Sequence, residues 1–293
     1  MPDYTELRPM SIGEILERSL RLYRYNFMTF FGIILVVNVI LFVVQQPMIY
    51  MQHVIFRGEA VHDEFGIAFM AYSSVFALLA VIAGIVAGGA LTLAVSERFL
   101  DRQAGVASSY RRIKDRLPAL IGTAILVGLI IVVGFLLCII PGIYFYFSFI
   151  LSAIVVVLER KGPRAAMSRS RELMRVKTER GFFTLRSNSA KALVILLIIF
   201  ALATVVNTVS AIPQLLVAAL YDAAGPDAGR FMYVMGLISG AINTVLESAV
   251  APVYTLPIVL LYYDIRIRFE GYDLEMLSQS LEGDGPEGAG EDV

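Results

Sequence analysis

The feature that most constrains this chain is a series of long apolar stretches that carry almost no charge. They cover residues 27–44, 66–96, 117–158, 192–221 and 231–263, and Glu247 is the only charged residue within them. A membrane-spanning helix needs about 20 predominantly apolar residues. The third stretch is therefore long enough for two spans, and the turn dipeptide Pro141-Gly142 predicts where it divides.

These stretches predict an all-α integral membrane protein, a six-helix transmembrane bundle. Composition agrees, because 17% of the residues are charged, whereas soluble domains average about 25%. One polytopic membrane domain is expected over 1–275, followed by a disordered acidic tail over 276–293. The predicted spans are 27–48, 67–95, 118–140, 143–158, 192–219 and 232–262.

The basic residues predict the orientation of the spans. Of the 24 lysines and arginines, only Arg57 and Arg230 fall outside four segments: before the first span, after the second, after the fourth and after the sixth. Cytoplasmic loops carry an excess of lysine and arginine. We therefore expect a multi-pass protein of the plasma (inner) membrane with its N-terminus and C-terminus in the cytoplasm.

Each pair of spans follows a basic segment with apolar residues at helical spacing. The first begins with Ser11 and Glu14, the pattern of a capping box, and the third begins at Pro163. The interpretation we favour is three hairpins, each preceded by a basic interfacial amphipathic helix; ordinary positively charged loops are the alternative. The predicted partner is a bilayer with anionic headgroups, with other membrane proteins as a second class and no nucleic acid. The expected headgroup contacts are Arg18, Arg21, Arg111, Arg112, Arg164, Arg171 and Arg175.

Glu247 lies near the middle of the last predicted span, where a carboxylate costs about 2.5–3.5 kcal/mol. Asn243 lies one turn before it, and Asn207 and Asn38 are candidate partners from other spans. Two interpretations stay open. The group forms a midplane proton or substrate site, or it is a hydrogen-bonded set that holds helices together.

Five sequence motifs are distributed along the chain: RPMSIGEILERSLRLYR at 8–24, PGIY at 141–144, VLERKGP at 157–163, AMSRSRELM at 166–174 and LYYDIRIRFEGYDLE at 261–275. Together they resemble the membrane domain associated with glycerophosphoryl diester phosphodiesterases. The resemblance covers almost the whole chain and implies a stand-alone membrane domain, since the segments outside the spans are too short for the catalytic barrel fused to some members.

Residues that could support catalysis are scarce. Cys138 is the single cysteine, and the two histidines, His53 and His62, lie on one loop beside Asp63 and Glu64 without metal-ligand spacing. No nucleophile–base pair or phosphate-binding loop is evident, so we expect no enzyme, no metal and no cofactor. The expected function is a non-enzymatic membrane scaffold or lipid-interacting module. The alternative is a carrier or channel for a small solute, lipid or ion that uses the Glu247 region.

Overall fold

The computed structural model describes residues 10–51, 63–175, 188–219 and 228–270, which are almost entirely helical. A 3₁₀ turn, Lys114–Arg116, joins the fourth and fifth helices. The helices are α1 (Ile12–Tyr25), α2 (Phe27–Tyr50), α3 (Asp63–Phe99), α4 (Val106–Ile113), α5 (Leu117–Leu137), α6 (Ile139–Phe149), α7 (Ser152–Glu159), α8 (Pro163–Arg175), α9 (Asn188–Ala219) and α10 (Ala228–Glu270).

The all-α membrane class is confirmed. Six helical segments in the described residues are long and apolar enough to cross a membrane, in the six places that the sequence predicts. The chain is therefore a multi-pass membrane protein. The last helix, α10, extends eight residues beyond its predicted end at Tyr262, although Pro252 and Pro257 lie inside it. These six apolar segments are α2, α3, α4 with α5, α6 with α7, α9 and α10.

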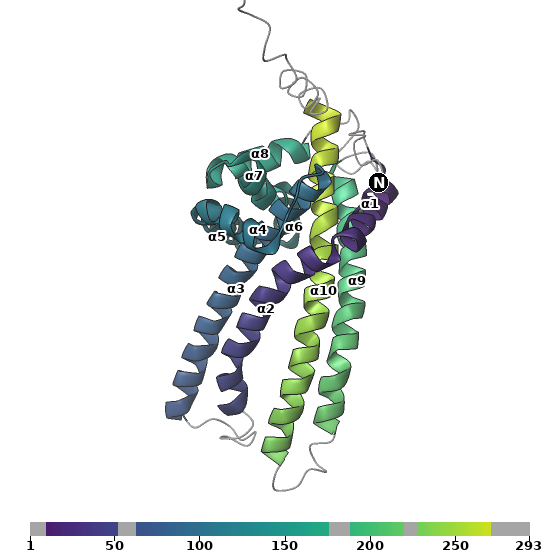
Figure 1. The fold of residues 1–293 in the computed structure, drawn as a ribbon. Helices are drawn as coiled ribbons and strands as arrows, with labels where there is room; N and C mark the ends of the chain where they lie inside the picture. Colours follow the sequence, from purple (N-terminus) through teal and green to yellow (C-terminus); the bar gives the residue numbers. More distant parts are fainter. Residues whose placement is uncertain (1–9, 52–62, 176–187, 220–227, 271–293) are drawn as a thin grey trace, which may run out of the picture.

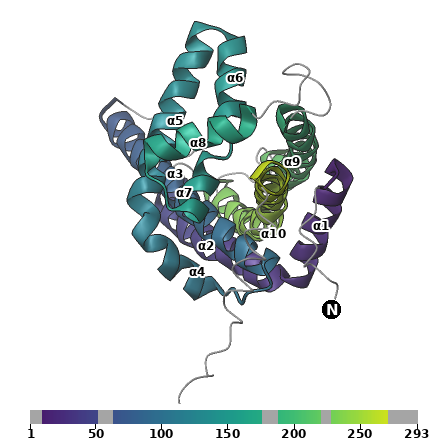
Figure 2. The same cartoon turned by 90° about the horizontal axis from the view of Figure 1, so that it is seen from above.

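The three predicted hairpins differ in direction. Helices α2, α3, α9 and α10 run side by side along the long axis of the molecule (Figure 1). The α5–α6 hairpin lies across them at one end, where Figure 1 shows it end-on and Figure 2 shows it along its length. Helices α1, α4, α7 and α8 and the C-terminal end of α10 gather at this same end. The sequence predicts the helices but contains no signal for the different direction of the second hairpin.

The turn of the crosswise hairpin lies at Cys138, three residues before the predicted Pro141-Gly142 break. Cys138 is extended, with φ −175° and ψ 157°. Two glycines bring α5 and α6 together. A Cβ atom on Gly134 would lie 3.0 Å from the Cα of Gly142, and one on Gly142 would lie 2.5 Å from the Phe135 ring. This contact therefore requires glycine on both helices.

The three basic segments form helices that pack on the bundle. Their apolar faces are covered by protein, since Ile15, Ile113 and Leu173 are at most 1% exposed. The Tyr110 hydroxyl donates a hydrogen bond of 2.5 Å to the carbonyl of Ile33, which joins α4 to α2. The predicted capping box at Ser11 is confirmed, and Pro163 is the first residue of α8 as expected. The apolar stripes of α1, α4 and α8 thus contribute to the protein core.

A buried carboxylate holds the N-terminal segment, α9 and α10 together. Asp264 is completely buried and accepts from Lys191 Nζ at 2.7 Å, from the Met10 backbone N–H at 2.6 Å and from Arg268 Nε at 3.1 Å. Lys191 and Arg268 also donate to the Met10 carbonyl. We call Asp264, Lys191, Arg268 and Met10 the buried clamp. It joins the first and last motifs of the resemblance, far apart in sequence, in one hydrogen-bonded unit.

Candidate anion-binding site

Five arginines converge on one cavity at the end of the bundle where α4 and α8 lie. The cavity has a volume of about 270 Å³ and is lined by side chains from α3, α7, α10 and the α3–α5 connection. We call it the arginine basin. Its polar lining consists of Arg102, Arg112, Arg116, Arg160, Arg266, Ser96, Glu97, Tyr262 and Tyr263. A second hollow of about 310 Å³ shares Arg112, Arg116 and Arg160 with it and adds Asp115 and Lys161.

The basin carries a surplus of positive charge. Glu97 is its single carboxylate, is 5% exposed and pairs with Arg112. Within the described residues, Arg102, Arg116 and Arg160 have no carboxylate within ion-pair distance. Arg112, Arg116 and Arg160 line both hollows. These arginines are therefore close enough to repel one another, which favours a bound anion.

Backbone conformation places two of the arginines. In the described residues, Asp101 and Arg160 are the non-glycine residues with positive φ, at 56° and 55°. Asp101 follows the end of α3. There the Arg102 N–H donates to the Glu97 carbonyl at 2.7 Å, as in a Schellman motif. Arg160 caps the end of α7. A left-handed non-glycine residue costs about 1–3 kcal/mol, and such residues concentrate at functional sites.

Buried tyrosines form one side of the basin. The Tyr262 hydroxyl donates to Glu159 Oε1 at 2.9 Å, and Tyr263 and Ser96 share a hydrogen bond of 2.6 Å between α10 and α3. The guanidinium of Arg266 lies over the Tyr262 ring, 5.9 Å from its centroid. These contacts fix α3, α7 and α10 relative to one another, so the arginines project from a rigid frame.

Of the seven arginines expected to contact headgroups, Arg112 alone lines the basin. Arg111 and Arg164 are exposed on α4 and α8, and Arg18 is partly buried on α1. For Arg21, Arg171 and Arg175 the contact is with another side chain of the protein. These side chains are Glu17 for Arg21, the Phe149 ring for Arg171, 5.0 Å away, and the Tyr144 hydroxyl for Arg175, 2.8 Å away.

Four of the five basin arginines are not among the site residues predicted from the sequence: Arg102, Arg116, Arg160 and Arg266. A partial signal existed for two of them. Arg160 lies in the VLERKGP motif and Arg266 in the final LYYDIRIRF motif. Each motif lies at the end of an apolar helix, on the side of the molecule rich in basic residues. That the two arginines meet at one cavity depends on how α7 packs against α3 and α10.

The predicted polar group around Glu247 is not assembled by hydrogen bonds within the described residues. Glu247 and Asn207 are exposed, and Asn207 donates to the Ala203 carbonyl of its own helix at 2.8 Å. Asn38 donates to the Ser248 hydroxyl of α10 at 3.0 Å, and Asn243 Oδ1 is buried without a partner. Asn38 therefore joins α2 to α10 through a hydrogen bond, as one of the two interpretations predicts, but Glu247 takes no part in this contact.

The loop with the two histidines lies largely outside the described residues, which include neither His53 nor His62 nor the side chains of Asp63 and Glu64. In the part of the chain that the structure describes, no three metal-binding side chains cluster. Comparison with family models, curated proteins and solved structures finds no match. The resemblance to the phosphodiesterase-associated membrane domain therefore stays a prediction.

Proposed function

We propose that this protein is a non-enzymatic, lipid-interacting membrane module that binds an anionic phosphate headgroup in the arginine basin. The observation that carries the proposal is the imbalance of charge: five guanidiniums face one carboxylate, and three of the five have no ion pair in the described residues. Guanidinium groups bind phosphate oxygens through paired, charge-assisted hydrogen bonds. A headgroup phosphate supplies the negative charge that the basin lacks.

The position of the basin supports a lipid headgroup as the occupant. It lies at the end of the apolar helices, where a headgroup would be in a bilayer. The distribution of basic residues supports the cytoplasmic leaflet of the plasma membrane as the side concerned. Anionic lipids are concentrated there, so the basin would meet its ligand at high local concentration.

The test uses the full chain in neutral detergent, titrated with phosphatidylglycerol or phosphatidylcholine while the unfolding temperature is measured. Phosphatidylglycerol should stabilise the protein, by about 2.7 kcal/mol at a free concentration 100 times its Kd, and phosphatidylcholine should not. The double variant Arg116→Gln/Arg160→Gln should lose this stabilisation. Binding should also weaken as salt is raised.

A matched control removes the same charge elsewhere. Arg111→Gln/Arg164→Gln neutralises two exposed arginines that do not line the basin. It should retain phosphatidylglycerol binding close to that of the unmodified chain. Equal losses in both double variants would mean that the protein attracts anionic lipid through its general charge, and the basin proposal would fail.

The carrier or channel alternative has less support. Such a function needs a water-accessible path to Glu247. None of the three cavities described for this chain is lined by Glu247, and no hydrogen bond joins Glu247 to Asn207 or Asn38 in the described residues. The geometry therefore favours the basin as the functional centre.

A further inference from the structure

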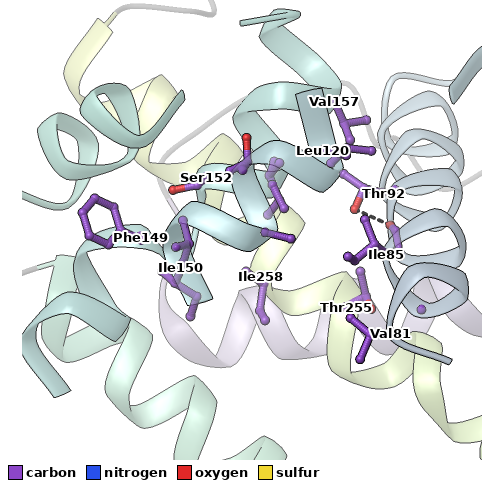
Figure 3. A pocket seen from close by; sticks show the side chains of 18 of the residues that line it. Val81, Ile85, Thr92, Leu120, Phe149, Ile150, Ser152, Val157, Thr255 and Ile258 are labelled. Carbon is purple, nitrogen blue, oxygen red and sulfur yellow. Dashed lines mark hydrogen bonds between the residues drawn. The ribbon is translucent and has the colours of Figure 1, made fainter. Parts of the chain in front are cut away.

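A large apolar cavity lies next to the arginine basin. It has a volume of about 590 Å³, is open on one side, and is lined by α3, α5, the α6–α7 segment and α10. Figure 3 shows Ile85 and Thr92 of α3 on one side of it and Phe149 and Ile150 on another. Sites for small organic ligands have volumes of about 300–1,000 Å³ and mostly apolar linings. This cavity has the size and chemistry of a site for a hydrocarbon chain.

The cavity and the basin lie next to each other along α3, α10, the end of α7 and the start of α5. At each of these four places, a residue that lines the cavity lies three or four positions in sequence from one that lines the basin. Within α3 and α10 this spacing is about one helical turn of 5.4 Å. The basin lining itself includes apolar side chains, among them Leu93 and Leu158. The pairs, with the cavity residue first, are Thr92 and Ser96, Leu120 and Arg116, Val157 and Arg160, and Ile258 and Tyr262.

Two further features distinguish this cavity from a packing gap. Gly84 and Gly88 line it, and a Cβ atom on either glycine would meet nothing within 4 Å, so their lack of a side chain keeps the space open. Ser152 also lines it, is 1% exposed, and its hydroxyl has no hydrogen-bond partner in the described residues. A buried hydroxyl without a partner is costly unless something else satisfies it. The ester carbonyl of a lipid is an acceptor of the right kind.

We infer that the basin and the cavity form one site for a whole anionic lipid, with the phosphate among the arginines and an acyl chain between α3 and α5. This inference rests on the proposed function and adds the chain-binding half of the site. It distinguishes two sources of the same phosphate chemistry. A membrane lipid would use both halves, whereas free phosphate would use the basin alone.

The decisive variant fills the cavity and leaves the basin unchanged. Gly88→Leu places a side chain in open space, and leucine is also the better helix former. Gly128→Leu is the matched control, because Gly128 is on α5, has nothing within 4 Å of its Cβ position and does not line the cavity. Gly84→Leu repeats the test at a second position if Gly88→Leu fails to fold.

The probes are dioleoyl phosphatidylglycerol, which carries two long chains, and inorganic phosphate, which carries none. Losing contact with a few methylene groups should weaken binding of dioleoyl phosphatidylglycerol to Gly88→Leu by about tenfold or more. Phosphate binding should be the same in Gly88→Leu, Gly128→Leu and the unmodified chain. Gly128→Leu should bind the lipid normally.

Fluorescence provides an independent readout, because the chain contains no tryptophan. Tyr146→Trp places a reporter in the cavity wall, and Leu136→Trp places one at the exposed tip of the α5–α6 hairpin. In phosphatidylcholine nanodiscs that contain a small fraction of phosphatidylglycerol with brominated chains, the Tyr146→Trp signal should be quenched more strongly. When Arg116→Gln and Arg160→Gln are combined with Tyr146→Trp in one chain, this excess quenching should disappear.

The two proposals fail in different ways. If Gly88→Leu binds dioleoyl phosphatidylglycerol as tightly as the unmodified chain and quenching at the two tryptophans is equal, the chain-binding inference is overturned and the basin proposal stands. If phosphate binds as tightly as the lipid, the basin takes free anions. If the basin double variant still binds the lipid normally, both proposals fail.

Discussion

The buried clamp and the arginine basin lie at the same end of the bundle and are built from charged residues in opposite ways. In the clamp, Asp264 is completely buried and is matched by Lys191, Arg268 and the Met10 backbone. In the basin, Glu97 is the single carboxylate among five arginines. Both cations of the clamp contact its carboxylate, whereas three of the five basin arginines have no carboxylate within ion-pair distance in the described residues.

This difference separates a structural role from a binding role. Buried charges are tolerated when each is paired and hydrogen-bonded, as in the clamp. A cavity lined by unmatched charges of one sign opposes folding slightly and attracts an oppositely charged ligand. The two regions share α10, where Arg266 lines the basin and Asp264 and Arg268 belong to the clamp. The LYYDIRIRF motif of α10 thus contributes residues to both the clamp and the basin.

Breaking the clamp should have the largest effect on stability. Asp264→Ala leaves Lys191, Arg268 and the Met10 N–H without their shared acceptor, and removing one partner of a buried ion pair costs about 3–5 kcal/mol. The loss should appear as a lower unfolding midpoint in neutral detergent. Anionic lipid binding by the folded fraction should be retained.

The control for the clamp is an exposed ion pair. Glu172 pairs with Arg169 at 3.1 Å and its side chain is 67% exposed, so Glu172→Ala should cost at most about 1 kcal/mol. If Asp264→Ala were no more damaging than Glu172→Ala, the clamp would not be the structural centre that its geometry indicates.

Removing positive charge from the basin should have a smaller effect, and of the opposite sign. Arg116 lines the same two cavities as Arg112 and Arg160, and it has no carboxylate within ion-pair distance in the described residues. Folding brings these like charges together, which disfavours the folded state. Without lipid, Arg116→Gln should raise the free energy of unfolding, by less than about 1 kcal/mol because the group is partly solvated.

Salt sharpens this prediction. Screening weakens repulsion between partly exposed charges, so raising the salt concentration should stabilise the lipid-free chain more than it stabilises Arg116→Gln. The clamp, which is buried, should respond little in either protein. Measured destabilisation by Arg116→Gln in the absence of lipid would show that Arg116 is a structural residue and would remove it from the proposed site.

The sequence contains strong signals for the helices and weak ones for the site. Long charge-free stretches predict all six apolar segments, because such runs have few stable alternatives. The capping box at Ser11 and the start of α8 at Pro163 follow from local chemistry and are also confirmed. By contrast, the turn at Cys138 depends on the contact between Gly134 and Gly142, which is tertiary.

The basin could not be predicted for a similar reason. Its arginines come from three segments that are separated by whole spans, and the sequence shows only that all of them are at the basic end. Arg111 and Arg112 are neighbours in sequence, yet only Arg112 lines the basin. Which side of a short helix faces the cavity is decided by packing, here by Ile113 and Tyr110 against the bundle.

The smallest effect is expected at Glu247, the residue that the sequence makes most conspicuous. Its side chain is exposed on α10 and lines none of the three described cavities. Glu247→Gln removes the charge but keeps the shape. Within the described residues no hydrogen bond and none of the three cavities depends on the Glu247 carboxylate, so the unfolding midpoint and phosphatidylglycerol binding should both change little. Ion and proton flux in proteoliposomes is the measurement that addresses the alternative function. Flux through the unmodified chain that disappears in Glu247→Gln would establish a carrier or channel at the midplane, and the basin would then be a second site instead of the functional centre.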